Sequence, residues 1–220
     1  MGLYYKLDFV LMKRVIIADD HAVVATGLGL ILENTPDIRI VAETRNGNEL
    51  LQKIRKEDFD LVILDISMPG MDAFDVLKEL KAIKPYLPVI IFTMNPEETY
   101  ALRMFQLGAA AYIKKETPPD EIIGIIDIVF KKKKYLTPEQ AYLLTQNLNN
   151  ESQILHELLT DREFQVLALL ASGVKKDEIA GKLNISKNTL SNHRNNLLKK
   201  LQLSNNAELT RYAIQHGFIQ

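Results

Sequence analysis

Leu61-Val62-Ile63-Leu64-Asp65 is a short aliphatic run that ends in a carboxylate, and it decides the fold of the first half of the chain. Similar runs lie at Val15–Ala18, Ile38–Ala42, Val89–Phe92 and Ala110–Ile113. Because each run is apolar on both faces and too short for a buried helix, we predict buried strands. Helical patterns separate the runs, at residues 22–33, 47–56, 73–83, 97–107 and 119–132. This alternation predicts an α/β domain with a doubly wound five-stranded parallel sheet.

The second half of the chain predicts a domain of a different class. Thr137-Pro138, an N-cap with Pro at the first helical position, predicts a short helix to about Gln146. The polar stretch Asn147–Gln153 predicts a linker. Helical periodicity then recurs at residues 161–171, 176–182, 187–201 and 205–216. We therefore divide the chain into a candidate N-terminal extension (1–11), an α/β domain (12–135), a linker with a short helix (136–156) and an all-α domain (157–220).

The composition of the 220-residue chain excludes several classes of protein. Hydrophobic residues make up 47% and charged residues 25%, which excludes a disordered or low-complexity chain. The absence of Cys excludes disulfides, thiolate metal sites and a Cys nucleophile. Because apolar stretches fall short of a membrane span and no signal peptide is evident, we expect a cytoplasmic protein. The net charge is only −1, but residues 157–220 hold nine Lys/Arg against six Asp/Glu, a balance suited to a polyanion.

Charged and hydroxyl side chains follow the predicted strands of the first domain. Asp19-Asp20 follow the first strand, Asp65 the third and Thr93 the fourth, and Lys115 lies just past the fifth. Parallel strands bring such residues to one edge of the sheet, where ligands of open α/β sheets bind. Carboxylate oxygens at this density suit Mg²⁺. One carboxylate could then accept a phosphoryl group as an aspartyl-phosphate, with Mg²⁺ and Lys115 stabilising the charge.

The motifs Asp19-Asp20, Asp65–Asp72, Thr93 and Tyr112–Lys115 resemble the receiver domain of bacterial two-component response regulators, from about Arg14 to Phe130. The resemblance implies the flavodoxin-like strand order 2-1-3-4-5 and phosphorylation by a sensor histidine kinase. It implies that Asp65 is the phosphoacceptor. It also implies that Mg²⁺ binds Asp20, Asp65 and the Ser67 backbone carbonyl, with Asp19 acting through water. Lys115 and Thr93 would contact the phosphoryl group, and Tyr112 would turn inward with Thr93.

Several residues depart from the receiver pattern without removing a group that the chemistry needs. Ala73 and Ala111 stand where Gly is usual, and Glu116 stands where Pro is usual. Met94 stands where a small residue is usual, and we expect it to narrow access to the phosphoryl group. His21 follows the two aspartates, and we expect a loop histidine there rather than a third metal ligand because the site is already rich in oxygen.

The second domain contains a predicted helix-turn-helix. Thr160 is a predicted N-cap, Gly173 a predicted helix end, and Asn184-Ile185-Ser186 a tight turn in which Ser186 caps the next helix. That next helix has an apolar stripe for the core and a polar stripe opposite, and from Lys187 to Lys200 it holds four basic residues and no acidic one. Asn can pair with adenine, and Lys or Arg can hold phosphate oxygens.

This block resembles the LuxR-type helix-turn-helix, and the whole chain resembles a NarL/FixJ-type response regulator. The resemblance implies a terminal dimerisation helix at residues 205–216 and DNA half-sites related by two-fold symmetry. Ser191 stands where Lys is usual, so the affinity and target sequence are expected to differ from those of relatives. Asn206 stands where an Arg is frequent. The expected DNA-contacting residues are Lys187, Asn188, Ser191, Asn192, Arg194, Asn195, Lys199 and Lys200.

These observations favour a phosphorylation-controlled DNA-binding transcription regulator that dimerises and frees its recognition helix when active. Its partners would be a histidine kinase and double-stranded DNA, with RNA polymerase a further candidate. The alternative is an atypical regulator that binds DNA without phosphorylation. A Mg²⁺-dependent phosphatase lacks any sign of a substrate cap, so we expect no enzyme. A protein-binding adaptor would not bind DNA in a salt-dependent manner.

Overall fold

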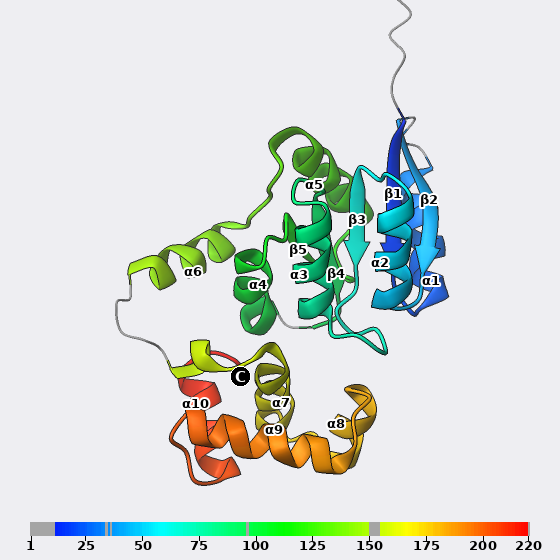
Figure 1. Cartoon of the computed structure of the whole chain (residues 1–220). Helices are drawn as coiled ribbons and strands as arrows, with labels where there is room; N and C mark the ends of the chain where they lie inside the picture. The colour runs from blue at the N-terminus through cyan, green and yellow to red at the C-terminus, as the bar shows by residue number, and fades with distance from the viewer. Residues whose placement is uncertain (1–11, 34, 36, 96, 150–154, 220) are drawn as a thin grey trace, which may run out of the picture.

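A computed structural model of the chain describes residues 12–33, 35, 37–95, 97–149 and 155–219. The predicted extension at residues 1–11 lies outside this described part. So do residues 150–153 of the predicted polar linker Asn147–Gln153. Two domains of different class are present (Figure 1), as the sequence predicts. Among the described residues, no helix combines the length and the apolar character needed to cross a bilayer.

The first domain is built on a five-stranded parallel sheet of order β2-β1-β3-β4-β5, which confirms the predicted fold. The strands are β1 (Lys13–Ala18), β2 (Ile38–Thr44), β3 (Leu61–Leu64), β4 (Val89–Thr93) and β5 (Ala111–Lys114). Their helices are α1 (Ala22–Leu32), α2 (Gly47–Lys56), α3 (Ala73–Ile83), α4 (Glu97–Gln106) and α5 (Pro119–Lys132).

Successive side chains of a strand point to opposite faces of the sheet, and the domain therefore has two hydrophobic cores, one on each face. Ile16 and Ala18 of β1 belong to the cluster under α2, α3 and α4, whereas Val15 and Ile17 belong to the cluster under α1 and α5. All four side chains are at most 1% exposed. A strand that is buried on both faces needs apolar residues at consecutive positions, which explains the unbroken aliphatic runs.

The connection to the second domain differs from the prediction at both ends. Helix α6 (Pro138–Asn149) begins at the predicted Pro, with Thr137 and Gln140 bonded reciprocally as in a capping box, but it continues beyond Gln146 into the predicted linker. A 3₁₀ turn, η1 (Leu155–Leu158), spans the predicted boundary at residue 156. Leu155 packs against the core of the second domain, so this domain includes residues before the predicted boundary.

The second domain contains α7 (Asp161–Ala171), α8 (Lys176–Lys182), α9 (Lys187–Lys200) and α10 (Asn206–Gln215). The predicted caps are confirmed: Thr160 forms a capping box with Glu163, and the Ser186 hydroxyl accepts the Thr189 N–H at 3.0 Å. Gly173 has φ +76°, a conformation that suits Gly at a helix end. Leu190, Leu197 and Leu201 are at most 2% exposed, so the apolar stripe faces the core as expected.

Candidate phosphoacceptor site and nucleic-acid interface

The strand register brings the predicted acidic residues to one edge of the sheet. Ala18 pairs with Leu64, and Leu64 pairs with Ile91, so β1 and β3 end at the same level of the sheet and β4 extends two residues further, to Thr93. The Asp65 N–H donates to the Ala18 carbonyl at 2.9 Å, which extends the ladder to the first residue after β3. On the other side of β4, the Lys115 N–H donates to the Thr93 carbonyl at 3.0 Å.

Lys115 joins the two buried aspartates. Its Nζ lies 2.6 Å from Asp19 Oδ2 and 2.8 Å from Asp65 Oδ2. Asp19 is 5% and Asp65 2% exposed. Burial alone would lower the pKa of Lys115, but hydrogen bonds to Asp19 and Asp65 outweigh it and the net pKa is raised. Lys115 therefore remains a fixed positive charge beside the carboxyl group of Asp65.

The remaining acidic residue completes a compact set of ligand atoms. One side-chain atom each from Asp19, Asp20, His21 and Asp65 falls within a group whose members lie within 4.8 Å of one another. The Ser67 N–H donates to Asp65 Oδ1 at 3.1 Å, which fixes the carboxylate and brings the loop after β3 next to it. The structure thus brings together Asp19, Asp20, Asp65, Ser67 and Lys115, as predicted.

Thr93 and Tyr112 lie in a hydrogen-bond network around Asn95. The Thr93 hydroxyl accepts the Asn95 backbone N–H at 3.3 Å, and Asn95 Nδ2 donates to Ser67 Oγ at 2.9 Å. The Tyr112 hydroxyl donates to the Asn95 carbonyl at 3.1 Å. Tyr112 is only 2% exposed, so its ring is buried in this structure. Sequence reasoning missed Asn95, because no spacing rule marks its connecting role.

Met94 faces the second domain. It is 62% exposed and lines a cavity together with residues of α7 and α10, including Leu169 and Ile214. The Met94 side chain therefore lies where the two domains meet. Its place next to Thr93 in the sequence does not indicate this position.

Helix α7 packs against the first domain beside the loop that follows Asp65. Asp161, at the first position of α7, forms ion pairs with Lys78 Nζ of α3 at 2.5 Å and with Arg103 Nη2 of α4 at 3.0 Å. The Arg103 guanidinium lies 4.7 Å from the centre of the Phe164 ring, and the Phe164 and Tyr100 rings meet edge to face at 6.1 Å. Charge pairs and aromatic contacts therefore both join the domains.

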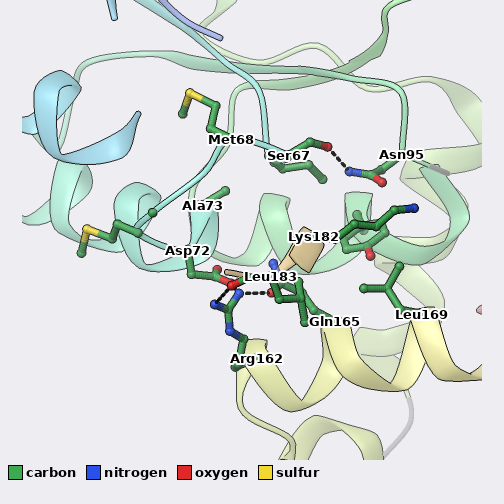
Figure 2. Close-up of a pocket in the computed structure, with 14 residues that line it drawn as sticks. Ser67, Met68, Asp72, Ala73, Asn95, Arg162, Gln165, Leu169, Lys182 and Leu183 are labelled. Atoms are coloured by element: carbon green, nitrogen blue, oxygen red, sulfur yellow. Dashed lines mark hydrogen bonds and ion pairs between the residues drawn. The ribbon is translucent and has the colours of Figure 1, made fainter. Parts of the chain in front are cut away.

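A second contact reaches the loop that follows Asp65. Arg162 Nη1 lies 3.3 Å from Asp72 Oδ2 and donates to Gln165 Oε1 at 2.9 Å. Burial raises the pKa of Asp72, against the opposing effects of the Phe74 N–H and Arg162. Figure 2 shows the cavity of about 250 Å³ beside this pair, with Ser67 and Asn95 on the receiver side and Arg162 and Gln165 on the α7 side. The interface therefore adjoins the site network through Asn95 and Ser67.

The predicted DNA-contacting residues lie on α9, and α7 lies between this helix and the receiver (Figure 1). The first domain leaves uncovered the exposed polar side of α9, which we call the reading side, so this arrangement does not support the expectation that the recognition helix must be freed. Six of the predicted residues are exposed: Lys187, Asn188, Ser191, Asn192, Asn195 and Lys199.

Three of the predicted DNA-contacting residues, Lys187, Arg194 and Lys200, also pair with side chains of other helices, and Lys187 does so with the exposed Asp177 at 2.9 Å. Lys200 Nζ lies 2.6 Å from Glu163 Oε2, and Glu163 is only 3% exposed. Arg194 Nε donates to Asn206 Oδ1 at 2.8 Å, which joins α9 to α10. Asn206 therefore has an acceptor role at the position where an Arg is frequent. A single sequence gives the spacing of these basic residues along α9, but not the acceptors that other helices place beside them.

Comparison with known proteins agrees with both domains. Residues 15–127 match the family described as the response regulator receiver domain, and residues 157–213 match the bacterial regulatory proteins of the luxR family. The response regulator UvrY of Escherichia coli (strain K12) is 29% identical over 208 residues, covering 94% of this chain and 95% of UvrY. The oxygen regulatory protein NreC of Staphylococcus epidermidis is 32% identical over 216 residues, covering 94% and 99%.

Solved structures agree over the same length. A structure of the RcsB response regulator of Salmonella typhimurium matches with a TM-score of 0.66 and 28% identity, covering 93% of this chain and 98% of RcsB. A structure of an RcsB–DNA complex matches with a TM-score of 0.57 and 30% identity, covering 92% and 98%. The likeness therefore extends across both domains.

Proposed function

Since the chain belongs to the response regulators that join a receiver domain to a LuxR-type DNA-binding domain, we propose that phosphorylation of Asp65 controls its binding to DNA. The observation that carries this proposal is the Lys115–Asp65 pair at 2.8 Å beside two further aspartates. The phosphodonor would be a sensor histidine kinase. In the transfer, the phosphorus–nitrogen bond of phosphohistidine breaks and a phosphorus–oxygen bond to the Asp65 carboxylate forms.

The donor set fits a divalent cation. Asp19, Asp20 and Asp65 supply three carboxylates, and Lys115 compensates one of their charges. Such an excess of negative charge on hard oxygen donors matches the preference of Mg²⁺. Asp20, Asp65 and the Ser67 carbonyl would hold the ion, with Asp19 acting through water. When bound, the ion would neutralise charge on the phosphoryl oxygens.

Two further side chains of the site, Lys115 and Thr93, would position the phosphoryl group. Lys115 would pair with its oxygens, exchanging part of its contact with Asp65 for one with the phosphate. Thr93 would rotate away from Asn95, and its hydroxyl would donate a hydrogen bond to a phosphoryl oxygen. Because Asn95 also contacts Ser67 and Tyr112, that movement would alter the receiver surface next to α7. We further propose that Asp65 holds the phosphoryl group as a signal and that the chain does not turn over external phosphate esters.

Phosphorylation is expected to raise DNA affinity by about 10-fold or more, the usual range for coupling between two sites. The measurement is a titration of the full chain against duplexes selected from random DNA, with and without acetyl phosphate and Mg²⁺. Equal affinity in both conditions would favour the phosphorylation-independent alternative. The exposed polar side of α9 is compatible with that alternative. DNA binding that does not weaken as salt rises would contradict both hypotheses, the phosphorylation-controlled and the phosphorylation-independent DNA-binding regulator.

The exposed Lys199 is expected to hold a DNA phosphate. Lys199→Ala should weaken binding to all duplexes alike and reduce the slope of log affinity against log salt by about 1. Lys176→Ala, which removes an exposed lysine from α8, is the matched control. An unchanged slope in Lys199→Ala would show that Lys199 does not contact a DNA phosphate.

Asp161→Asn is expected to shift the equilibrium between docked and separated domains about 10-fold toward separation. The substitution weakens contacts to Lys78 and Arg103, and a mostly buried carboxylate between two cations contributes about 1–2 kcal/mol. NMR relaxation of the full chain would detect the separation as independent tumbling of the two domains. Asp177→Asn, which affects the solvent-exposed pair with Lys187, should leave the tumbling unchanged. Unaltered tumbling in Asp161→Asn would contradict a stabilising role for this contact.

A further inference from the structure

We propose that His21 is a nitrogen ligand of the cation site and biases the site toward transition-metal ions such as Mn²⁺ and Co²⁺ relative to Mg²⁺. This inference rests on the proposed function, because it concerns the same acidic site. It revises the expectation that His21 is an ordinary loop histidine. The reason for the revision is the position of its ring relative to the two aspartates that precede it.

The His21 ring nitrogen faces the carboxylates. Nδ1 lies 2.9 Å from Asp20 Oδ1 and 3.2 Å from Asp19 Oδ1. One ring nitrogen of His21 also belongs to the set of ligand atoms, with Asp65, that lie within 4.8 Å of one another. The imidazole is therefore directed at the same small region as the three carboxylates.

These separations match those of ligands that share one ion. In octahedral coordination with bonds of about 2.1 Å, two donors on adjacent corners lie about 3.0 Å apart. The 2.9 Å between His21 Nδ1 and Oδ1 of Asp20, the carboxylate proposed to bind the ion directly, is close to that value. When no ion is bound, a hydrogen bond between the His21 ring and the Asp20 carboxylate accounts for the same separation. An ion could therefore bind to these donors with little rearrangement of the His21 ring.

The backbone holds His21 in this orientation. Its N–H donates to Asp19 Oδ1 at 2.8 Å, so the residue is fixed to the carboxylate that its ring approaches. His21 is also the residue before the first turn of α1, where its own side chain caps no backbone N–H. The ring is 64% exposed, which leaves the side of the site toward the solvent open to an entering ion.

An imidazole changes the preference of an oxygen-rich site. Mg²⁺ favours carboxylate, carbonyl and water oxygens, whereas first-row transition metals also bind imidazole well. His21 would thus add binding energy for Mn²⁺ or Co²⁺ and little for Mg²⁺. The rest of the donor set suits either class of ion, so the bias depends on this one side chain.

The test uses Mn²⁺ alone as the probe, bound to the unphosphorylated full chain. Electron spin-echo spectroscopy is expected to show coupling between Mn²⁺ and a ¹⁴N nucleus in the wild-type protein and no such coupling in His21→Ala. His193→Ala, which removes a histidine from α9, is the matched control and should retain the coupling. Bound Mn²⁺ without ¹⁴N coupling in the wild type, or coupling that persists in His21→Ala, would overturn the proposal.

Calorimetry supplies a second measurement. His21→Ala should weaken Co²⁺ binding at least about 10-fold, since loss even of a second-shell partner commonly costs 10- to 100-fold in metal affinity. Mg²⁺ binding should change less than about 3-fold, and an equal loss for both ions would overturn the proposed bias. Mg²⁺-dependent labelling of the wild type by acetyl phosphate is followed in parallel. Its failure would contradict the proposed function, whereas labelling without ¹⁴N coupling would contradict only the role of His21.

Discussion

Asp65→Asn is expected to abolish labelling of the full chain by acetyl phosphate in the presence of Mg²⁺, a decrease of at least about 100-fold. The amide has nearly the same shape as the carboxylate, so it can still lie beside Lys115 and accept the Ser67 N–H. An amide oxygen is, however, too weak a nucleophile to attack the phosphodonor, and it carries no charge to help bind the cation. The measurement is phosphate incorporation per chain, followed by the mass of the intact protein.

The control for this substitution is Asp75→Asn, which removes an exposed carboxylate from the first turn of α3. It should label like the wild type. Undiminished labelling of Asp65→Asn would refute the assignment of the phosphoacceptor and with it the proposed control of DNA binding. Labelling that moves to a neighbouring aspartate would show as a modified peptide that contains Asp19 or Asp20.

Glu163→Ala is expected to lower the free energy of unfolding of the DNA-binding domain by about 3 kcal/mol. Glu163 accepts the Thr160 N–H at 2.8 Å as part of the capping box and also pairs with Lys200 at 2.6 Å. Alanine leaves the backbone N–H without that acceptor and Lys200 without its counter-charge. Lys200 is 35% exposed and can partly turn to water, which places the cost at the lower end for a buried pair.

The pH dependence of this effect follows from the ionisation of Glu163. Burial alone would raise the pKa of Glu163, but the hydrogen bonds from Lys200 and Thr160 outweigh it and the net pKa lies below its usual value. Its contribution to stability is therefore present above the pKa of the unfolded chain and is lost as pH falls through the lower pKa of the folded chain. The difference between wild type and Glu163→Ala should shrink in acid.

Urea unfolding of the full chain at several pH values measures this difference. Glu178→Ala, which removes an exposed glutamate from the first turn of α8, is the control and should cost less than about 1 kcal/mol. Glu163→Gln should retain part of the capping contribution and lose the ion pair, and so fall between the other two variants. A pH-independent loss, or a loss equal to that of Glu178→Ala, would contradict the role of the pair with Lys200.

Local sequence was sufficient to predict the strands and the position of Asp65 at the edge of the sheet. Leu61–Leu64 is apolar at every position, which is how a strand buried on both faces must read, and Asp65 follows as the first residue beyond it. Because all strands are parallel, each side chain after a strand lies at the same edge. The site could therefore be placed without knowledge of any distant contact.

The pair between Lys200 and Glu163 shows what the same reasoning does not provide. The position of Lys200 near the end of α9 places it among basic residues suited to DNA, but a buried acceptor, Glu163, comes from α7, which precedes it by more than thirty residues. Helical periodicity describes one helix and is silent about its neighbours. The same limit hid Asn95, whose contacts with Ser67 and Tyr112 depend on how three segments meet.

The amino-acid sequence by itself determined the two domains, the parallel sheet and the aspartates at its edge, because each depends on short-range periodicity and on residues that follow a strand directly. Only the tertiary structure decided that Asp161 and Arg162 of α7 meet the receiver beside Asp72, that the reading side of α9 is left open, and that the His21 ring faces the aspartates. Those features arise from rigid elements packing against one another and from the loops that connect them. Contacts of this kind depend on side-chain geometry summed over distant segments, which no local pattern encodes.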